Sequence, residues 1–418
     1  GLPGTELAIS ESQERMAVVV ASADIDKFVA LAAEENLSAT PVATVTDDRR
    51  MKMYHRGRAI VDISRDFLDT NGVKQVTGAI IEDNKTTFFR PIGGQIDFAR
   101  AMKNTLSQLN VCSKKGLAEM FDSTIGARSV YMPFGGKYQM TPVTAMAAKV
   151  VGGETDDCTV SAYGYCPNLM ADSPFTGAIY SIVASVAKVV AAGADYKDIR
   201  LTLQEFFMRL REDKKRWGVP LSALLGALYA QMNLGLGAIG GKDSMSGTFE
   251  DIDVPPTLIS FAIAPAKASQ LITNVVENDY TGLYLLPMKK DGASIPDIEY
   301  LKKLYASGHK NIANGNITMA TVVEKGGPAA AVAKSCFGNG FGFEFDCKES
   351  KAFSESYGDI IVACKNVYAL KGLDVVYLGK PTTQNFFSMG GKSVSIREAL
   401  GSYTSRLNDV FPATAKAV

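Results

Sequence analysis

The feature that most constrains the fold is a long apolar segment in the middle of the chain. Residues 176 to 192 are mostly small or branched apolar residues, with Ser173-Pro174 before them and Gly193 after them. Proline at the first turn and glycine just past the last turn are typical of a helix start and end. Lys188 interrupts the segment, so no run of about 18 uncharged apolar residues remains, and we expect no membrane-spanning segment.

The length, charge and cysteine content of the chain limit the class of protein to which it can belong. The chain has 418 residues, with 44 basic and 44 acidic side chains and 46% hydrophobic residues. This ordinary globular composition suggests roughly two to three domains, and the zero net charge favours neither nucleic acid nor an acidic membrane as a partner. Six cysteines without a CxxC pair, and only two histidines, predict reduced thiols rather than a zinc site. No signal peptide is evident, so we expect a cytoplasmic protein.

The first 70 residues predict part of an α+β domain. Residues 15 to 22 and 40 to 46 are rich in strand-forming side chains, and residues 58 to 63 form a third such run. Asp24 is a good N-cap for a helix whose apolar residues recur at helical spacing. These elements are half of an α+β sandwich, so we expect a fragment whose partner elements lie upstream.

A complete α+β pattern closes the chain. Polar residues around 71 to 72 and 83 to 84 suggest a linker, and a second long helix is predicted from Pro220 to Asn233. A strand is then predicted from 281, helices over 297–307 and 327–336, and strands over 359–363 and 374–378. The order resembles that of the first 70 residues, which suggests an internal repeat.

Three polar segments are candidate ligand sites. SESQER at 10–15 concentrates hydrogen-bonding groups before a predicted strand, although a solvated loop has the same composition. GGKDSMS at 240–246 sets glycines, which let a backbone approach phosphate, beside Lys and Ser donors. It lacks P-loop spacing because Asp243 follows Lys242. DSTIGA at 122–127 with FGGK at 134–137 is the third candidate; for the two glycine-rich segments, ordinary turns are the alternative.

The two histidines give no catalytic arrangement. His55 and His309 lie far apart in the sequence and have no Ser or Cys motif beside them. We expect His55 in an exposed hairpin and His309 in a turn that ends a helix. No catalytic residue is therefore predicted in this chain.

Together these segments resemble one family. SESQERM, DSTIGA, SPFTGAIYSIVASVAKVVAAGAD and GGKDSM stand in the order and spacing of the later synthetase region of formylglycinamide ribonucleotide amidotransferase (phosphoribosylformylglycinamidine synthase). The resemblance implies an α+β fold in which an aminoimidazole-ribonucleotide-synthetase-like N-domain precedes a C-domain. It places the tail of a first C-domain at 1–75, the second N-domain at 76–272 and the second C-domain at 273–418.

The resemblance also implies an ATP-dependent ligase of purine biosynthesis. The family converts formylglycinamide ribonucleotide to the amidine through an iminophosphate, formed from ATP with Mg²⁺ and attacked by ammonia from glutamine. The family's catalytic His and most Mg²⁺ carboxylates belong to the first synthetase half, upstream of this chain. We therefore expect the isolated chain to be inactive, to require that half and a glutaminase domain or subunit, and to self-associate without them.

Residue by residue, the resemblance assigns two groups of contacts. Substrate contacts fall on Glu11, Ser12, Gln13 and Ser244. ATP contacts fall on Gln204, Gly241, Lys242 and Asp243. In small family members a metal-binding Asn occupies the position of Lys242. A protonated lysine cannot ligate Mg²⁺, so we expect Lys242 to meet phosphate directly and predict no metal ligand here.

One departure concerns a second site. Large family members hold a structural Mg-ADP there, and in alignment with them Ala145 replaces an Asp, Ala184 a Glu and Lys188 an Asn. Mg²⁺ requires oxygen ligands, so we expect no metal-nucleotide there and expect Lys188 to pair with an acid such as Asp243. An alignment shifted by a few residues would instead make Asp156 or Asp172 the ligands.

Two alternative functions stay open. One is another enzyme of the same ATP-binding superfamily, such as a selenophosphate synthetase or a small-molecule kinase; these are shorter and carry a glycine-rich N-terminal segment absent here. The other is a non-catalytic scaffold half, which a binding assay with ATP and ribonucleotide would distinguish from a ligand-binding fragment.

Overall fold

The computed structural model describes the chain except for residues 12–14, 70–75, 83–96, 122, 278–279 and 414–418. The described chain separates into two compact units, residues 1–77 and 78–418. The predicted division of the second unit near residue 272 stays a prediction.

The first unit is small, and its described residues form no buried core. It contains short helices, a longer helix and one hairpin: α1 (Gly4–Ile9), α2 (Ile25–Glu34), α3 (Arg65–Asp69), β1 (Arg50–His55) and β2 (Arg58–Ser64). The predicted helix after Asp24 and the strand from Arg58 are confirmed. The strands predicted over 15–22 and 40–46 are wrong, since no strand forms there. None of the described residues of this unit is buried, and a β-branched run forms a strand only where neighbours pack against it.

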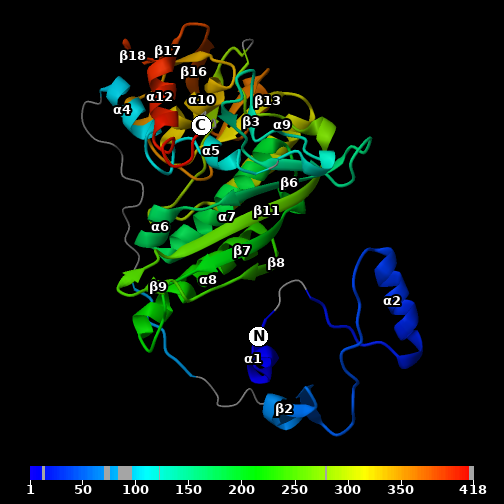
Figure 1. Cartoon of the computed structure of the whole chain (residues 1–418). Helices are drawn as coiled ribbons and strands as arrows, with labels where there is room; N and C mark the ends of the chain where they lie inside the picture. Colours follow the sequence, from blue (N-terminus) through cyan, green and yellow to red (C-terminus); the bar gives the residue numbers. More distant parts are fainter. Residues whose placement is uncertain (12–14, 70–75, 83–96, 122, 278–279, 414–418) are drawn as a thin grey trace. The chain divides into compact units, whose positions relative to one another are not determined.

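A five-stranded sheet forms one part of the second unit. Its strands lie in the order β5 (Met146–Lys149), β6 (Asp157–Gly164), β11 (Thr257–Lys267), β7 (Arg200–Phe206) and β8 (Ala238–Lys242). Neighbours are antiparallel except β7 and β8, which are parallel and joined through helix α8 (Lys214–Leu234). Helix α7 (Pro174–Ala192) packs on β6 and β11, and α8 packs along α7 (Figure 1).

Helix α7 is the apolar segment expected from the sequence. Ser173 accepts a hydrogen bond from the Thr176 N–H at 3.3 Å, and Gly193 ends the helix with φ 121°. The helix is long and apolar enough to cross a membrane, but 94% of that window is buried inside the protein. It is therefore the core helix of this unit, with Lys188 among its buried residues.

Helix α8 begins at Lys214 rather than near Pro220. The Asp213 carboxylate caps it by accepting from the Lys215 N–H at 2.9 Å, and Pro220 is accommodated inside the helix. The proline therefore did not mark the start, because a side-chain cap upstream satisfies the first free N–H groups.

A seven-stranded sheet forms the rest of the second unit. Its order is β13 (Ile317–Val322), β15 (Ile360–Cys364), β12 (Leu283–Leu286), β16 (Val376–Thr382), β14 (Gly342–Phe345), β17 (Phe386–Met389) and β18 (Lys392–Ser395). The longer helices here are α4 (Phe98–Leu106), α9 (Ile298–Ala313), α10 (Gly327–Phe337) and α12 (Ile396–Ser405). His309 lies inside α9, not in a turn that ends it, because the helix runs on to Ala313.

Short elements complete the second unit: α5 (Lys115–Ala118), α6 (Pro167–Asp172), α11 (Glu349–Ala352), β3 (Phe134–Gly135), β4 (Thr141–Pro142), β9 (Thr248–Phe249) and β10 (Ile252–Asp253). The predicted α+β class is confirmed. The six cysteines are free, four of them buried, as expected for reduced thiols.

Candidate functional site

Strands β7 and β8 bring three predicted ligand residues together. In their parallel register Gln204 lies opposite Lys242, and Leu203 lies opposite Gly241. The Gln204 side-chain amide donates to the Lys242 carbonyl at 3.3 Å. Parallel strands need a crossover between them, and α8 supplies it, so residues almost 40 positions apart along the chain become neighbours.

The expected glycine-rich loop is partly a strand, which corrects the sequence interpretation. Gly240, Gly241 and Lys242 belong to β8. The ladder continues beyond the strand end, because the Phe207 N–H donates to the Ser244 carbonyl at 2.8 Å. Glycine favoured a turn on local grounds, but pairing with β7 decided the outcome.

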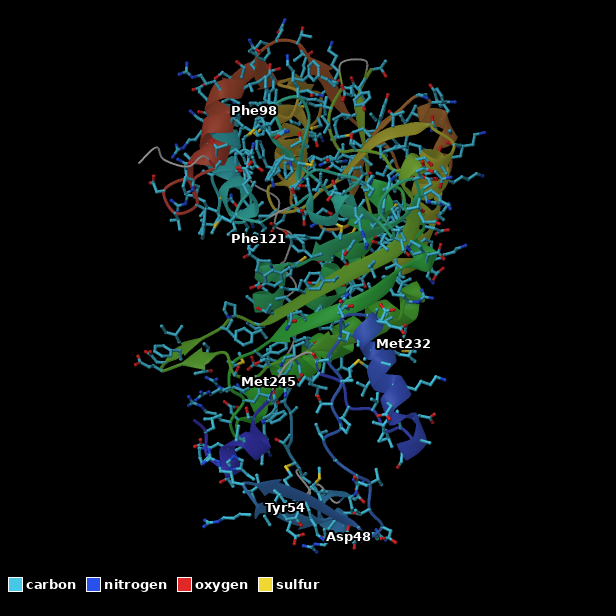
Figure 2. All side chains as sticks on the ribbon, turned by 45° about the vertical axis from the view of Figure 1, so that its right-hand side comes forward. Asp48, Tyr54, Phe98, Phe121, Met232 and Met245 are labelled. Carbon is cyan, nitrogen blue, oxygen red and sulfur yellow. The ribbon has the colours of Figure 1, made fainter. Side chains whose placement is uncertain are left out.

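Strand alternation divides this segment between two faces of the sheet. Gln204 and Lys242 share the face turned away from the helices, whereas Glu205 and Asp243 share the face toward them. Met245, labelled in Figure 2, packs against the helix-side core and follows the same alternation. The predicted ATP-contacting residues therefore do not converge on one surface.

The two glycines of β8 have different reasons to be glycine. A Cβ at Gly240 would meet open space, so its backbone can be approached by a ligand. A Cβ at Gly241 would overlap the carbonyl oxygen of Leu203, so that glycine is required by the contact with β7.

The polar groups on the open face at this end of the sheet are a cation and hydroxyls. The Lys242 ammonium is exposed and donates to the Asp243 carbonyl at 2.9 Å. The hydroxyls of Ser244 and Ser246 lie 2.7 Å apart. A cation and hydroxyls beside an unobstructed backbone suit a phosphate group.

Glu205 is a functional candidate that the sequence reasoning missed. It is 4% exposed, and its Oε1 has no hydrogen-bond partner. Burial raises the pKa of this carboxyl to about 7, and the negative charge of Asp243 adds to the rise. The sequence does contain an indication of this burial. Leu201, Leu203 and Phe207 lie at alternate positions on the same side of the strand as Glu205, so an acid occupies a position where an apolar residue is expected.

The remaining predicted residues are less informative. Glu11 is exposed and follows α1, while Ser12 and Gln13 lie outside the described residues. In the third segment, Asp122 is likewise outside them. Gly136 has φ 84°, and a Cβ there would overlap the backbone of Gly338, so an internal contact explains this glycine.

The expected pairing of Lys188 with Asp243 is wrong. The Lys188 ammonium lies 2.7 Å from Glu324 Oε1, donates to the Tyr163 carbonyl at 3.0 Å and sits 4.4 Å from the Tyr163 ring centre. Tyr163 belongs to β6, whereas Asp243 follows β8, and β11 and β7 separate those strands. Burial alone would lower the Lys188 pKa, but the Glu324 carboxylate raises it overall.

A cavity of about 370 Å³ lies beside the end of α7. Ala145 and Ala192 line it together with Tyr131, Asn274 and Glu277. Ala184 and Lys188, the other two residues aligned with the second site, are not part of this lining. The absence of a metal-nucleotide from that site stays a prediction.

Comparison with known proteins agrees with the motifs. The family model "AIR synthase related protein, C-terminal domain" matches residues 2–56. A PurL subunit of phosphoribosylformylglycinamidine synthase from Thermoplasma acidophilum is 24% identical over 373 residues, covering 84% of this chain and 48% of that protein. The PurL subunit of Pyrococcus furiosus is 24% identical over 421 residues, covering 94% and 57%. Over most of its length this chain is similar to PurL subunits.

Solved PurL structures share its fold. Thermotoga maritima PurL complexed with ATP matches with a TM-score of 0.63 at 16% identity, covering 91% of this chain and 57% of that one. The complex of that PurL with FGAR matches with a TM-score of 0.64 at 16% identity, covering 90% and 55%. The chain spans about half the length of the curated PurL relatives it matches. The predicted resemblance is confirmed.

Proposed function

We propose that this chain is part of an ATP-dependent ligase that converts formylglycinamide ribonucleotide to formylglycinamidine ribonucleotide in purine biosynthesis. The observation that carries the proposal is the pairing of Gln204 with Lys242 on the open face of the sheet. The open backbone of Gly240 lies beside them. This arrangement supplies charge, hydrogen-bond donors and access for a phosphate-bearing ligand.

In the proposed reaction the ribonucleotide amide oxygen attacks the γ-phosphorus of ATP, and ADP leaves. Ammonia from glutamine then displaces phosphate from the iminophosphate. Such transfers depend on positioning and on neutralising charge at phosphate oxygens. Lys242 would neutralise one phosphate charge, while the Gln204 amide and the Ser244 hydroxyl would orient the bound groups.

Mg²⁺, when bound, would neutralise further phosphate charge. Among the residues that the structure describes, no group of three or more His, Cys, Asp and Glu side chains could hold a metal ion. Most ligands for the Mg²⁺ of the reaction would therefore come from phosphate oxygens and from the first synthetase half.

The partners follow from the same proposal. No described residue of the first unit is buried, so residues 1–77 require further apolar surface to fold on. We assign that role to the rest of a first C-domain, and assign ammonia supply to a glutaminase domain or subunit. The setting would be the cytoplasm.

Calorimetric titration of ATP into the purified chain tests the proposal. Lys242→Met should weaken ATP binding about tenfold, because one charged contact is lost. Lys197→Met removes an exposed lysine before the opposite end of β7 and should leave binding unchanged. If neither ATP nor formylglycinamide ribonucleotide binds saturably, the chain is a scaffold and the proposal fails.

A further inference from the structure

Glu205 is a buried acid without a partner. It is 4% exposed, Oε1 accepts no hydrogen bond, and neither an ion pair nor a hydrogen bond to its side chain is present among the described residues. Buried carboxylates are normally paired or coordinate a metal, because leaving water costs several kcal/mol otherwise. The side chain therefore lacks a group that would stabilise it.

Asp243 stands directly beside it. Gln204 lies opposite Lys242, and the Phe207-to-Ser244 hydrogen bond keeps that register, so Glu205 lies opposite Asp243. Residues opposite each other in neighbouring strands are about 4.8 Å apart and point to the same face. A buried acid, Glu205, and an exposed acid, Asp243, are thus neighbours where β7 and β8 end.

No cation of the described chain compensates this pair. Lys242 points to the other face, and its ammonium donates to the Asp243 carbonyl rather than to the carboxylate. The two carboxyl groups are not joined by a hydrogen bond either, so a shared proton does not bridge them. Burial, and to a lesser extent the negative charge of Asp243, opposes ionisation of Glu205 and raises its pKa.

We propose that Glu205 and Asp243 together bind a divalent hard cation, such as Mg²⁺ or Mn²⁺. One or two carboxylates are the usual protein contribution to a Mg²⁺ site, with water or phosphate oxygens as the other ligands. The absence of a third acidic, Cys or His ligand among the described residues fits this open type of site. The cation would remove the repulsion between the two acids and give Oε1 its missing partner.

The test is titration of Mn²⁺ alone into the full chain, followed by electron paramagnetic resonance and by calorimetry. One saturable site in the millimolar range or tighter is expected. Glu205→Gln and Asp243→Asn should each weaken it at least tenfold. Glu154→Gln, an exposed acid in the turn between β5 and β6 at the far edge of the sheet, should leave it unchanged.

Thermal unfolding gives a second measurement. Mn²⁺ should raise the Tm of the parent and of Glu154→Gln, but not of Glu205→Gln or Asp243→Asn. Because Asp243 is exposed, Asp243→Asn is expected to fold even if the buried substitution is not tolerated. Absence of saturable binding, or equal binding by the parent and Asp243→Asn, would overturn the site. The proposal stands apart from the ligase function, because the metal is titrated without nucleotide.

Discussion

Replacing Glu324 by Gln should destabilise the protein more than removing Lys188. The Lys188 side chain is 6% exposed and that of Glu324 is 38% exposed. In Glu324→Gln the buried ammonium keeps neutral acceptors, the amide oxygen of the new glutamine and the Tyr163 carbonyl, and the Tyr163 ring, but loses the negative charge that compensates it. In Lys188→Met the buried charge disappears, and Glu324 can turn toward water.

The magnitudes follow from this asymmetry. Breaking a fully buried pair costs about 3–5 kcal/mol, and a hydrogen bond to a charged group is worth about 1.5–3 kcal/mol. Since water reaches Glu324, we expect about 2 kcal/mol for Glu324→Gln. Lys188→Met should cost about 1 kcal/mol or less, because apolar replacements of buried ionic groups are often near neutral.

Urea unfolding followed by the fluorescence of Trp217 measures both variants. Trp217 is the single tryptophan and lies on α8, which packs along the helix that carries Lys188. Glu299→Gln is the control, because Glu299 is 83% exposed and its pair with Lys302 should be worth under about 1 kcal/mol. A loss for Lys188→Met equal to or larger than that for Glu324→Gln would refute this reasoning.

Three further predictions concern titration, activity and the second site. Glu205 has its pKa raised from 4.5 to about 7, so between these values the folded state holds a proton that the unfolded state has lost. Stability should fall by about 3 kcal/mol as pH rises through that window, and Tm measured against pH with chelator should show no such fall for Glu205→Gln. The isolated chain should form no amidine with ATP and ammonia; product formation by pure chain, followed by chromatography, would contradict its assignment as a partial synthetase. Mg-ADP titrated calorimetrically should not bind beside Ala145 or Lys188, and a tightly retained nucleotide there would show that the alignment is wrong.

Local signals predicted the helices better than the strands. The start and end of α7 depend on Ser173, Pro174 and Gly193, which act within one turn of the helix. Both ends of this helix could therefore be predicted from the sequence. The strand predicted over 15–22 has the right side chains but no neighbour among the described residues of its unit. A strand needs a partner strand, which is often distant in sequence, and a local pattern does not identify that partner.

The same limit explains the errors at the candidate site. Gln204 and Lys242 could be placed together only through the relation to a family, since their contact depends on a crossover through α8. The partner of Lys188 was misidentified because Glu324 comes from the segment between β13 and α10. The burial of Glu205 could be predicted from the alternation of apolar residues within β7. That prediction also requires knowing that helices cover one face of this strand.

A single irregularity in β8 determines what each face of the site presents. Leu201 lies opposite Ala238, yet Thr202 lies opposite Gly240, so Ile239 is an extra residue in the ladder. Ile239 is 70% exposed, as expected for a bulged residue on an edge strand. Without it every later side chain would move to the other face. Lys242 would then lie opposite Glu205 and neutralise it, and Asp243 would lie on the open face opposite Phe206. The bulge therefore keeps the lysine available for an anion on one face and leaves two acids uncompensated on the other.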